Sequence, residues 1–149
     1  MSLNQEVDLL RKIPLFAKIE PSKLKLLAFA SERISFAAGE ELFHQGDTGD
    51  SAYIIVDGAA EIVIDTPAGP VRVAEVSKND FVGEIAILCD VPRTATVKAV
   101  SGLTTLKITK DLFFRMLTDF PEMAVEIMRV LALRLDHANT RLREALGAR

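Results

Sequence analysis

Residues 81–96, FVGEIAILCDVPRTAT, form the stretch on which the interpretation of this sequence depends. Gly83 allows a backbone turn and a close approach to another group. The segment from Glu84 to Leu88 is long enough for one or two helical turns, whose first amides have no helical acceptor and attract anions. Arg93 follows Pro92 and carries a planar guanidinium suited to an oxyanion. Because its neighbours are largely apolar, burying Arg93 without an anionic partner would be unfavourable.

The sequence alone is compatible with two kinds of partner for Arg93, a side chain of the protein or a ligand. Glu84 could form an ordinary buried ion pair with it. Alternatively, the donors and the carboxylate together recognise one ligand, because a carboxylate accepts from hydroxyl groups while the guanidinium and the free amides bind an oxyanion. A sugar that carries a phosphate offers both groups. The segment therefore points to phosphosugar recognition, without indicating cyclisation or the identity of a base.

This segment lies inside a region of alternating hydrophobicity that extends from Ile34 to Ile108. Turn-forming stretches at 45–50, 57–58, 66–70 and 101–102 divide the region into runs typical of short strands. The neighbouring runs 53–56 and 60–65 predict a hairpin with an Asp-Gly turn. Seven or eight strands at this spacing predict a mainly β fold, an antiparallel jelly-roll barrel of about eight strands.

Helices are predicted on both sides of the barrel. Leu3, Val7 and Leu10 recur at helical spacing, and Ser2 could form a capping box with Gln5. A second helix is predicted to begin at Pro21, with Leu24, Leu27 and Ala28 on one face. A short helix over 111–117 precedes a long final helix that begins near Pro121. We expect one domain over 1–149, with N-terminal helices at 1–33, the barrel at 34–108 and C-terminal lid or dimer helices at 109–149.

The final helix carries a seam of apolar residues at alternating steps of three and four: Met128, Leu131, Leu135, Ala138, Leu142 and Ala145. The seam covers about two and a half heptads. It either packs on the helix's own barrel or pairs two subunits. We favour pairing into a homodimer, because the helix projects beyond what a small barrel can cover.

The composition excludes several classes of function. With 49% apolar and 26% charged residues, the 149-residue chain can bury a core. A net charge of -3 argues against a surface that neutralises nucleic-acid phosphates. The single cysteine suits a reducing, cytoplasmic compartment, and two distant histidines argue against a multi-histidine metal site. No apolar run approaches the roughly 20 residues of a membrane helix, and no signal peptide opens the chain.

Residues 81–96 resemble the phosphate-binding cassette of cyclic nucleotide-binding domains, as found in protein kinase regulatory subunits, gated channels and the catabolite activator protein family. The Gly-Glu pair at 83–84, the alanine two residues after the glutamate, and Pro-Arg-Thr-Ala-Thr at 92–96 stand at the family's spacing. The turns at 38–40 and 45–47 and the run at 53–58 are also similar to the family's. The likeness spans most of residues 13–135.

The resemblance implies a ligand-binding role for a set of residues in this segment: Val82, Gly83, Glu84, Ile85, Ala86, Pro92, Arg93, Thr94 and Ala95. Arg93 would bind the exocyclic phosphate oxygens and Glu84 the ribose 2'-hydroxyl, with backbone amides completing the phosphate site. Threonine at position 94 is typical of cGMP-dependent kinases, whereas regulatory subunits selective for cAMP tend to have alanine. Gated channels with threonine there still bind cAMP, so Thr94 does not decide the base.

In this family the final helix usually covers the base. The resemblance places the base contacts at Ala138 and Asn139, where the hydroxyl pair of the catabolite activator protein is absent. Asn139 alone could hydrogen-bond a purine edge. Arg134 could stack on the base, although a solvated arginine on a helix face is the more common arrangement. Arg134, Leu135 and Asn139 are therefore the candidate base contacts.

We expect a regulatory module that binds a cyclic nucleotide, cAMP in preference to cGMP, and transmits binding through movement of the C-terminal helix. The alternative is a dimerisation or protein-interaction module with a non-functional cassette. An enzyme on a cupin-like barrel is disfavoured, because His44 alone cannot supply a ligand set for a metal. We therefore expect no catalysis, no metal and no cofactor. With Arg149 as the last residue, we also expect no DNA-binding region in this chain, and the lack of a long apolar run predicts no membrane segment in it.

Overall fold

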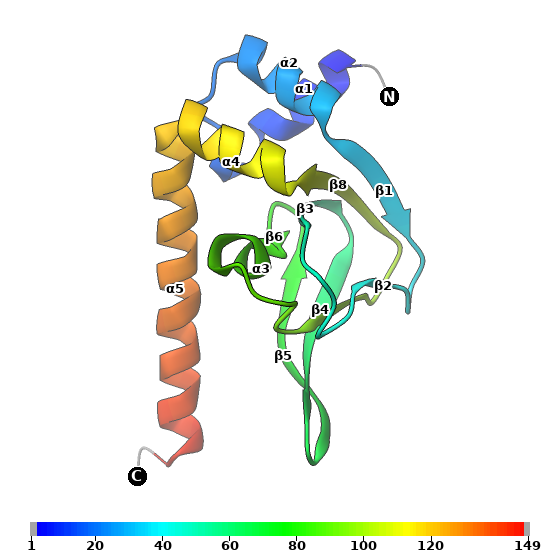
Figure 1. The fold of residues 1–149 in the computed structure, drawn as a ribbon, viewed down its shortest axis with the longest axis vertical. Helices are drawn as coiled ribbons and strands as arrows, with labels where there is room; N and C mark the ends of the chain where they lie inside the picture. Colours follow the sequence, from blue (N-terminus) through cyan, green and yellow to red (C-terminus); the bar gives the residue numbers. More distant parts are fainter. Residues whose placement is uncertain (1–2, 148–149) are drawn as a thin grey trace.

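In the computed structural model, which describes residues 3–147, two four-stranded antiparallel sheets form the body of the molecule (Figure 1). The strands are β1 (Glu32–Phe36), β2 (Glu41–Phe43), β3 (Ser51–Asp57), β4 (Ala59–Thr66), β5 (Gly69–Ser77), β6 (Phe81–Val82), β7 (Thr96–Ala99) and β8 (Leu103–Thr109). One sheet has the order β1-β8-β3-β6 and the other β2-β7-β4-β5. The predicted jelly roll of about eight antiparallel strands with flanking helices is confirmed.

The predicted hairpin between residues 53–56 and 60–65 is wrong. β3 pairs with β6 and β8, whereas β4 pairs with β5 and β7, so the chain passes from one sheet to the other at Asp57 and Gly58. Gly58 has a φ of 94°, and a Cβ on it would clash with the carbonyl oxygen of Gly102. The Asp-Gly pair therefore makes a corner that packs against the turn at 101–102. The hairpin partner of β4 is instead β5, through the turn at 66–69.

Six helical segments flank the sheets within the described chain: α1 (Leu3–Arg11), the short 3-10 helix η1 (Pro14–Phe16), α2 (Pro21–Ala30), α3 (Glu84–Cys89), α4 (Lys110–Asp119) and α5 (Pro121–Ala145). The predicted starts at Pro21 and Pro121 are confirmed, because proline fits the first turn of a helix. Leu24, Leu27 and Ala28, which were predicted to share one helix face, are buried. The predicted capping box rests on Ser2, which lies outside the described residues.

Two apolar clusters make up the core. One lies between the sheets and includes Tyr53, Ile55 and Leu103. The other joins the N-terminal helices to the sheet of β3 and β8, and it includes Met123 and Ile127 at the start of α5. The first turns of α5 are therefore anchored in the core.

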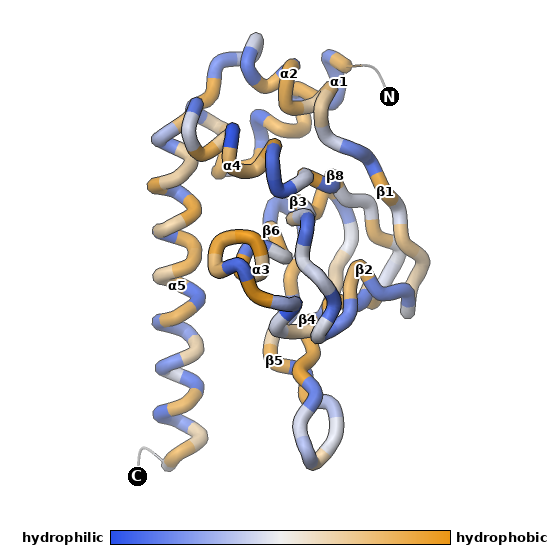
Figure 2. Tube along the Cα trace, viewed as in Figure 1, coloured by the Kyte–Doolittle hydropathy of each residue, from blue (hydrophilic) through white to orange (hydrophobic). Residues whose placement is uncertain are grey.

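Beyond these anchored turns, α5 leaves the body of the molecule. It extends past the sheets in the same direction as the β4–β5 hairpin (Figure 1). Hydrophobic and hydrophilic residues alternate along the helix to its C-terminal end (Figure 2). Leu135 and Leu142 of the predicted seam are 63% and 57% exposed, so these two side chains are not buried against the helix's own barrel.

Candidate functional site

A cavity of about 720 Å³ lies between α5, the segment around α3, and the strands β4 and β5. Apolar residues from β4, β5 and β7 form much of its wall, and a few charged side chains project from α3, β5 and α5. The lining residues are Phe43, Ile62, Ile64, Val73, Ala74, Glu75, Val76, Asp80, Val82, Gly83, Glu84, Ile85, Ala86, Arg93, Thr94, Ala95, Val97, Leu131, Arg134, Leu135, His137, Ala138 and Arg141. An apolar cavity of this size with a few polar groups is typical of a small-molecule site.

The structure brings most of the predicted site residues together in this cavity. Those that line it are Val82, Gly83, Glu84, Ile85, Ala86, Arg93, Thr94 and Ala95. Pro92 is exposed and is not a lining residue. Of the candidate base contacts, Arg134 and Leu135 line the cavity, whereas Asn139 is exposed and lies outside its lining.

Arg93 is buried, with only 4% of its surface exposed, and several contacts fix its side chain. Its Nη1 donates to the carbonyl oxygen of Gly83 at 3.0 Å and its Nη2 to that of Ser51 at 2.8 Å. The guanidinium carbon lies 3.9 Å from the centre of the Phe43 ring. The backbone is fixed as well, because the Arg93 amide donates to Asp47 at 2.8 Å. These contacts leave the guanidinium one orientation.

Two glycines make room for this arginine. Gly83 has a φ of 89°, and a Cβ on it would lie 2.7 Å from Nη1 of Arg93 and 3.0 Å from the carbonyl oxygen of Ser51. A Cβ on Gly49 would clash with Ala86 and approach Nε of Arg93 to 3.3 Å. The close approach predicted at Gly83 is therefore confirmed, and the group approached is the guanidinium of Arg93.

One donor of Arg93 is unused. Its Nε is buried and has no hydrogen-bond partner, and Arg93 forms no ion pair with any carboxylate of residues 3–147. Burial lowers the pKa of the guanidinium from its ordinary value, while Tyr53, Asp50, Asp47 and Glu84 oppose that shift. An arginine side chain stays protonated in proteins. A buried cation with a free donor therefore lines the cavity, and an oxyanion would satisfy it.

Glu84, the first residue of α3, supplies a buried acceptor. It is 3% exposed, and its Oε1 accepts from Nη1 of Arg134 at 2.9 Å. Burial raises the pKa of the Glu84 carboxyl above its ordinary value, and Arg134, its own backbone amide and Arg93 partly offset that increase. The alternative of a Glu84–Arg93 ion pair is not realised, because the carboxylate is paired with Arg134 instead.

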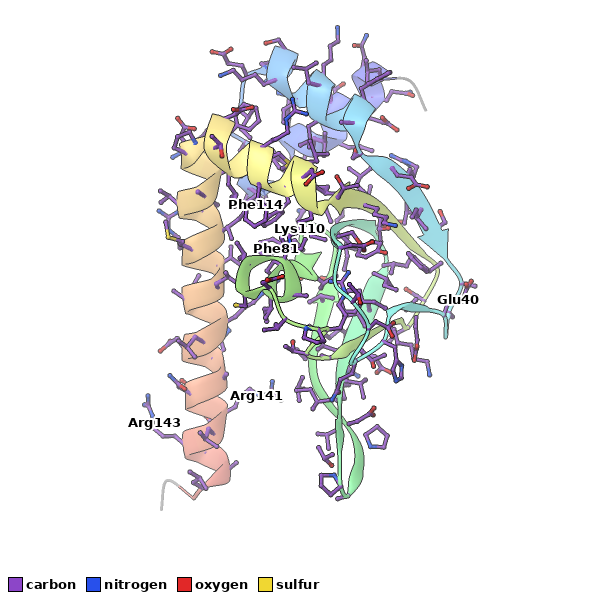
Figure 3. All side chains as sticks on the ribbon, viewed as in Figure 1. Glu40, Phe81, Lys110, Phe114, Arg141 and Arg143 are labelled. Atoms are coloured by element: carbon purple, nitrogen blue, oxygen red, sulfur yellow. The ribbon has the colours of Figure 1, made fainter. Side chains whose placement is uncertain are left out.

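Arginines of α5 cross to the barrel at two points. Besides Glu84, Arg134 contacts Phe81: its Nη2 donates to the carbonyl oxygen at 2.7 Å, and its guanidinium lies 4.7 Å from the ring centre. Farther along α5, Nη1 of Arg141 donates to the carbonyl oxygen of Val73 on β5. Figure 3 shows Arg141 pointing from α5 toward the β4–β5 hairpin, while Arg143 points away from it. These contacts place α5 over the cavity.

Sequence reasoning missed several residues of the cavity, notably Phe43, Glu75, His137 and Arg141. Phe43 and Arg141 have partners far away in the sequence, and nothing in their local pattern marks them. Within residues 3–147, no group of three or more His, Cys, Asp and Glu side chains is placed to hold a metal. None of the described helices has the length and apolarity needed to cross a bilayer.

Comparisons with known proteins give the family of this domain. The sequence profile of the cyclic nucleotide-binding domain matches residues 33–120. The cAMP-dependent protein kinase regulatory subunit of Blastocladiella emersonii is 36% identical over 109 residues, which are 72% of this chain and 27% of that protein. The chain thus spans about a quarter of that relative's length.

Two solved structures have the same fold. The N-terminal domain of a transcriptional regulator from Streptomyces coelicolor A3(2) is 32% identical with a TM-score of 0.67, over 89% of this chain and 96% of that one. The regulatory domain of Toxoplasma gondii PKA, crystallised with cAMP, has a TM-score of 0.77 at 20% identity, over 87% of this chain and 50% of that one.

Proposed function

This chain belongs to the cyclic nucleotide-binding domain family, and from that membership we propose that it is a regulatory module that binds a cyclic nucleotide in the cavity under α5. The observation that carries the proposal is the buried Nε of Arg93, which has no partner. A buried donor left unsatisfied costs about 1–3 kcal/mol, and more when the group is charged. A phosphate oxygen in the cavity removes this penalty, which favours a ligand with a phosphate at this point.

The roles of the two charged residues follow from their chemistry. Arg93 binds the exocyclic phosphate oxygens through Nε, while its two Nη atoms stay on the carbonyl oxygens that hold them. Glu84 accepts from the ribose 2'-hydroxyl, because a buried carboxylate needs donors. The first-turn amides of α3 have no acceptor within the helix and complete the phosphate site. Ile62, Ile64 and Val73 offer an apolar surface to the base.

We favour cAMP over cGMP as the ligand. The kinase regulatory subunit that this chain matches is named as cAMP-dependent, and the Toxoplasma domain was crystallised with cAMP. Thr94 lines the cavity, and its hydroxyl could meet both the phosphate and the amino group of guanine. The affinity ratio of the two nucleotides in wild type and Thr94→Ala therefore measures how far Thr94 favours cGMP.

Transmission and assembly both involve α5 in this proposal. Ligand binding shifts the helix between two positions, and differential affinity for those positions carries the signal to a partner. The exposed apolar residues Met128, Leu135 and Leu142 support pairing of two copies along this helix. The cytoplasmic location stays a prediction from the single cysteine.

Calorimetric titration with cAMP and with cGMP tests the proposal. The protein is first unfolded, dialysed and refolded, because a co-purified nucleotide would mask the site. Adenosine, which lacks the phosphate, is the control ligand and should bind far more weakly than cAMP. Binding of either cyclic nucleotide at micromolar concentration or below supports the proposal. Correctly refolded protein that binds neither would contradict it and favour an interaction module with a non-functional cassette.

A further inference from the structure

The outer side of α2, far from the nucleotide cavity, carries large apolar side chains that the fold leaves uncovered. Leu26 is 71% exposed and Phe29 is 83% exposed, although other apolar residues of the same helix are buried in the core. The two residues are three positions apart and therefore share one face of the helix, and Lys25 lies on that face one turn before Phe29. We call Lys25, Leu26 and Phe29 the α2 outer face.

The α2 outer face belongs to one end of the molecule. Helices α1 and α2 form this end, and the tip of the β4–β5 hairpin lies at the opposite end (Figure 1). Leu26 and Phe29 line neither the cavity under α5 nor the small recess beside α1. They therefore stand on the outside of the protein, as side chains that enter a partner rather than as the wall of a groove.

The charge of this end has the opposite sign to that of the whole chain. Residues 11–30 contain five lysines or arginines and one carboxylate, a net charge of +4, whereas the chain has a net charge of -3. When the two carboxylates of α1 are included, residues 3–30 still carry +2. All five cations are exposed, and none of them is in an ion pair with another residue of 3–147. An anionic surface would complement this charge.

We propose that the α2 outer face is a peripheral membrane-binding site, which takes a bilayer that contains anionic lipids. Leu26 and Phe29 enter the boundary between headgroups and acyl chains, as the apolar face of an interfacial helix does. Lys25 and the neighbouring cations lie at the headgroups, because a lysine can bury its aliphatic stem and keep its ammonium among the lipid phosphates. This site is separate from the nucleotide cavity and goes beyond the proposed function.

Two observations favour a lipid surface over a second protein. A stable protein interface buries roughly 800 Å² on each partner, from about 20 or more residues. The α2 outer face offers two large apolar side chains, which is a small part of that area. A protein would also need a pocket shaped to receive Leu26 and Phe29, whereas a bilayer deforms around them. Apolar side chains with cations beside them are the combination that an anionic bilayer binds.

Co-sedimentation with lipid vesicles tests the proposal. Wild type is mixed with vesicles of phosphatidylcholine alone and with vesicles that contain about one third phosphatidylserine. Phe29→Ser should weaken binding to the anionic vesicles by about tenfold or more, because a buried aromatic ring is lost. Lys25→Gln should weaken it roughly fivefold, the factor for one lysine near a charged membrane, and added salt should do the same.

Matched controls are available elsewhere on the surface. Val71, on β5 near the tip of the hairpin, is 46% exposed, and Lys98 on β7 is exposed as well. Val71→Ser and Lys98→Gln remove the same kinds of group far along the chain from α2, so both variants should bind anionic vesicles as wild type does. Thermal unfolding checks that all four variants are folded.

The outcomes decide the proposal independently of nucleotide binding. Wild type that binds both kinds of vesicle equally, or a Phe29→Ser variant that binds anionic vesicles as wild type does, would refute it. Wild type that binds neither vesicle would also refute it, and weaker self-association of Phe29→Ser in ultracentrifugation would then identify a second copy as the occupant of this face. Affinity for cAMP, measured separately by calorimetry, should be the same in wild type and all four variants.

Discussion

Replacing Arg93 with lysine isolates the interaction that carries the proposed function. The substitution keeps the positive charge but removes the planar fork, in which two Nη atoms bind carbonyl oxygens and Nε is free for the ligand. One ammonium group cannot replace both carbonyl contacts and also bind a phosphate oxygen along the direction of Nε. We therefore expect at least one charged hydrogen bond to be lost from the bound state.

The magnitude follows from the strength of such bonds. A hydrogen bond to a charged group contributes about 1.5–3 kcal/mol, which corresponds to roughly 10- to 150-fold in affinity. Alanine is a less suitable replacement for this test. Arg93→Ala leaves the carbonyl oxygens of Gly83 and Ser51 without their donor and removes the packing on Phe43, so it also destabilises the fold.

Calorimetric titration of refolded Arg93→Lys with cAMP measures the effect, and thermal unfolding checks that the variant is folded. Arg115→Lys is the matched control, because Arg115 is exposed on α4 and does not line the cavity. Adenosine has no phosphate, so its affinity should be the same for wild type and Arg93→Lys. Wild-type affinity of Arg93→Lys for cAMP would refute the reasoning.

Three other predictions concern the surroundings of this site. Gly83→Ala should lower the free energy of unfolding by about 1–3 kcal/mol more than Gly69→Ala does, as measured by chemical denaturation. Both glycines have a positive φ, but only Gly83 has neighbours that a Cβ would meet. Equal losses of unfolding free energy in the two variants would contradict this prediction. Burial raises the pKa of Glu84, so its stabilising contribution is complete below the ordinary value of 4.5 and is lost as pH rises through the raised pKa. Melting temperatures measured against pH should therefore fall more steeply above pH 4.5 in wild type than in Glu84→Gln, and parallel curves would show that burial of Glu84 has no such effect. Leu142→Glu should weaken self-association by about tenfold or more in analytical ultracentrifugation, because it places a charge in an apolar seam. Wild-type protein that sediments as a monomer would exclude the dimer.

The sequence predicts the elements of this fold better than their pairing. Alternation of apolar residues and the glycine turns indicate about eight strands, because both signals are local. Which sheet a strand joins depends on partners far away in the chain, and an Asp-Gly pair suits a hairpin turn as well as a corner. At residues 57–58 the choice is made by packing against Gly102, a contact that local pattern does not contain.

In the candidate site, too, local features could be predicted from the sequence and long-range contacts could not. The predicted site residues lie within one short stretch, 82–95, so their chemistry could be interpreted together, and eight of them line the cavity. The partner of Glu84 is Arg134, 50 residues later, and the ring under Arg93 is that of Phe43 from another strand. Both are ordinary surface or strand residues by their local pattern. The contacts that orient the two charged groups therefore emerge only from the fold.

The way α5 is mounted gives it the mechanics of a lever. Its fulcrum is the anchored turn at Met123 and Ile127, which are 1% and 3% exposed. At 1.5 Å per residue, Arg134 lies about 10 Å beyond Ile127, and Ala145 about 27 Å. A rotation about these turns that displaces Arg134 would thus move the end of the helix through about two and a half times that distance. A small shift of α5 at the cavity would therefore become a larger displacement at the far end of the helix.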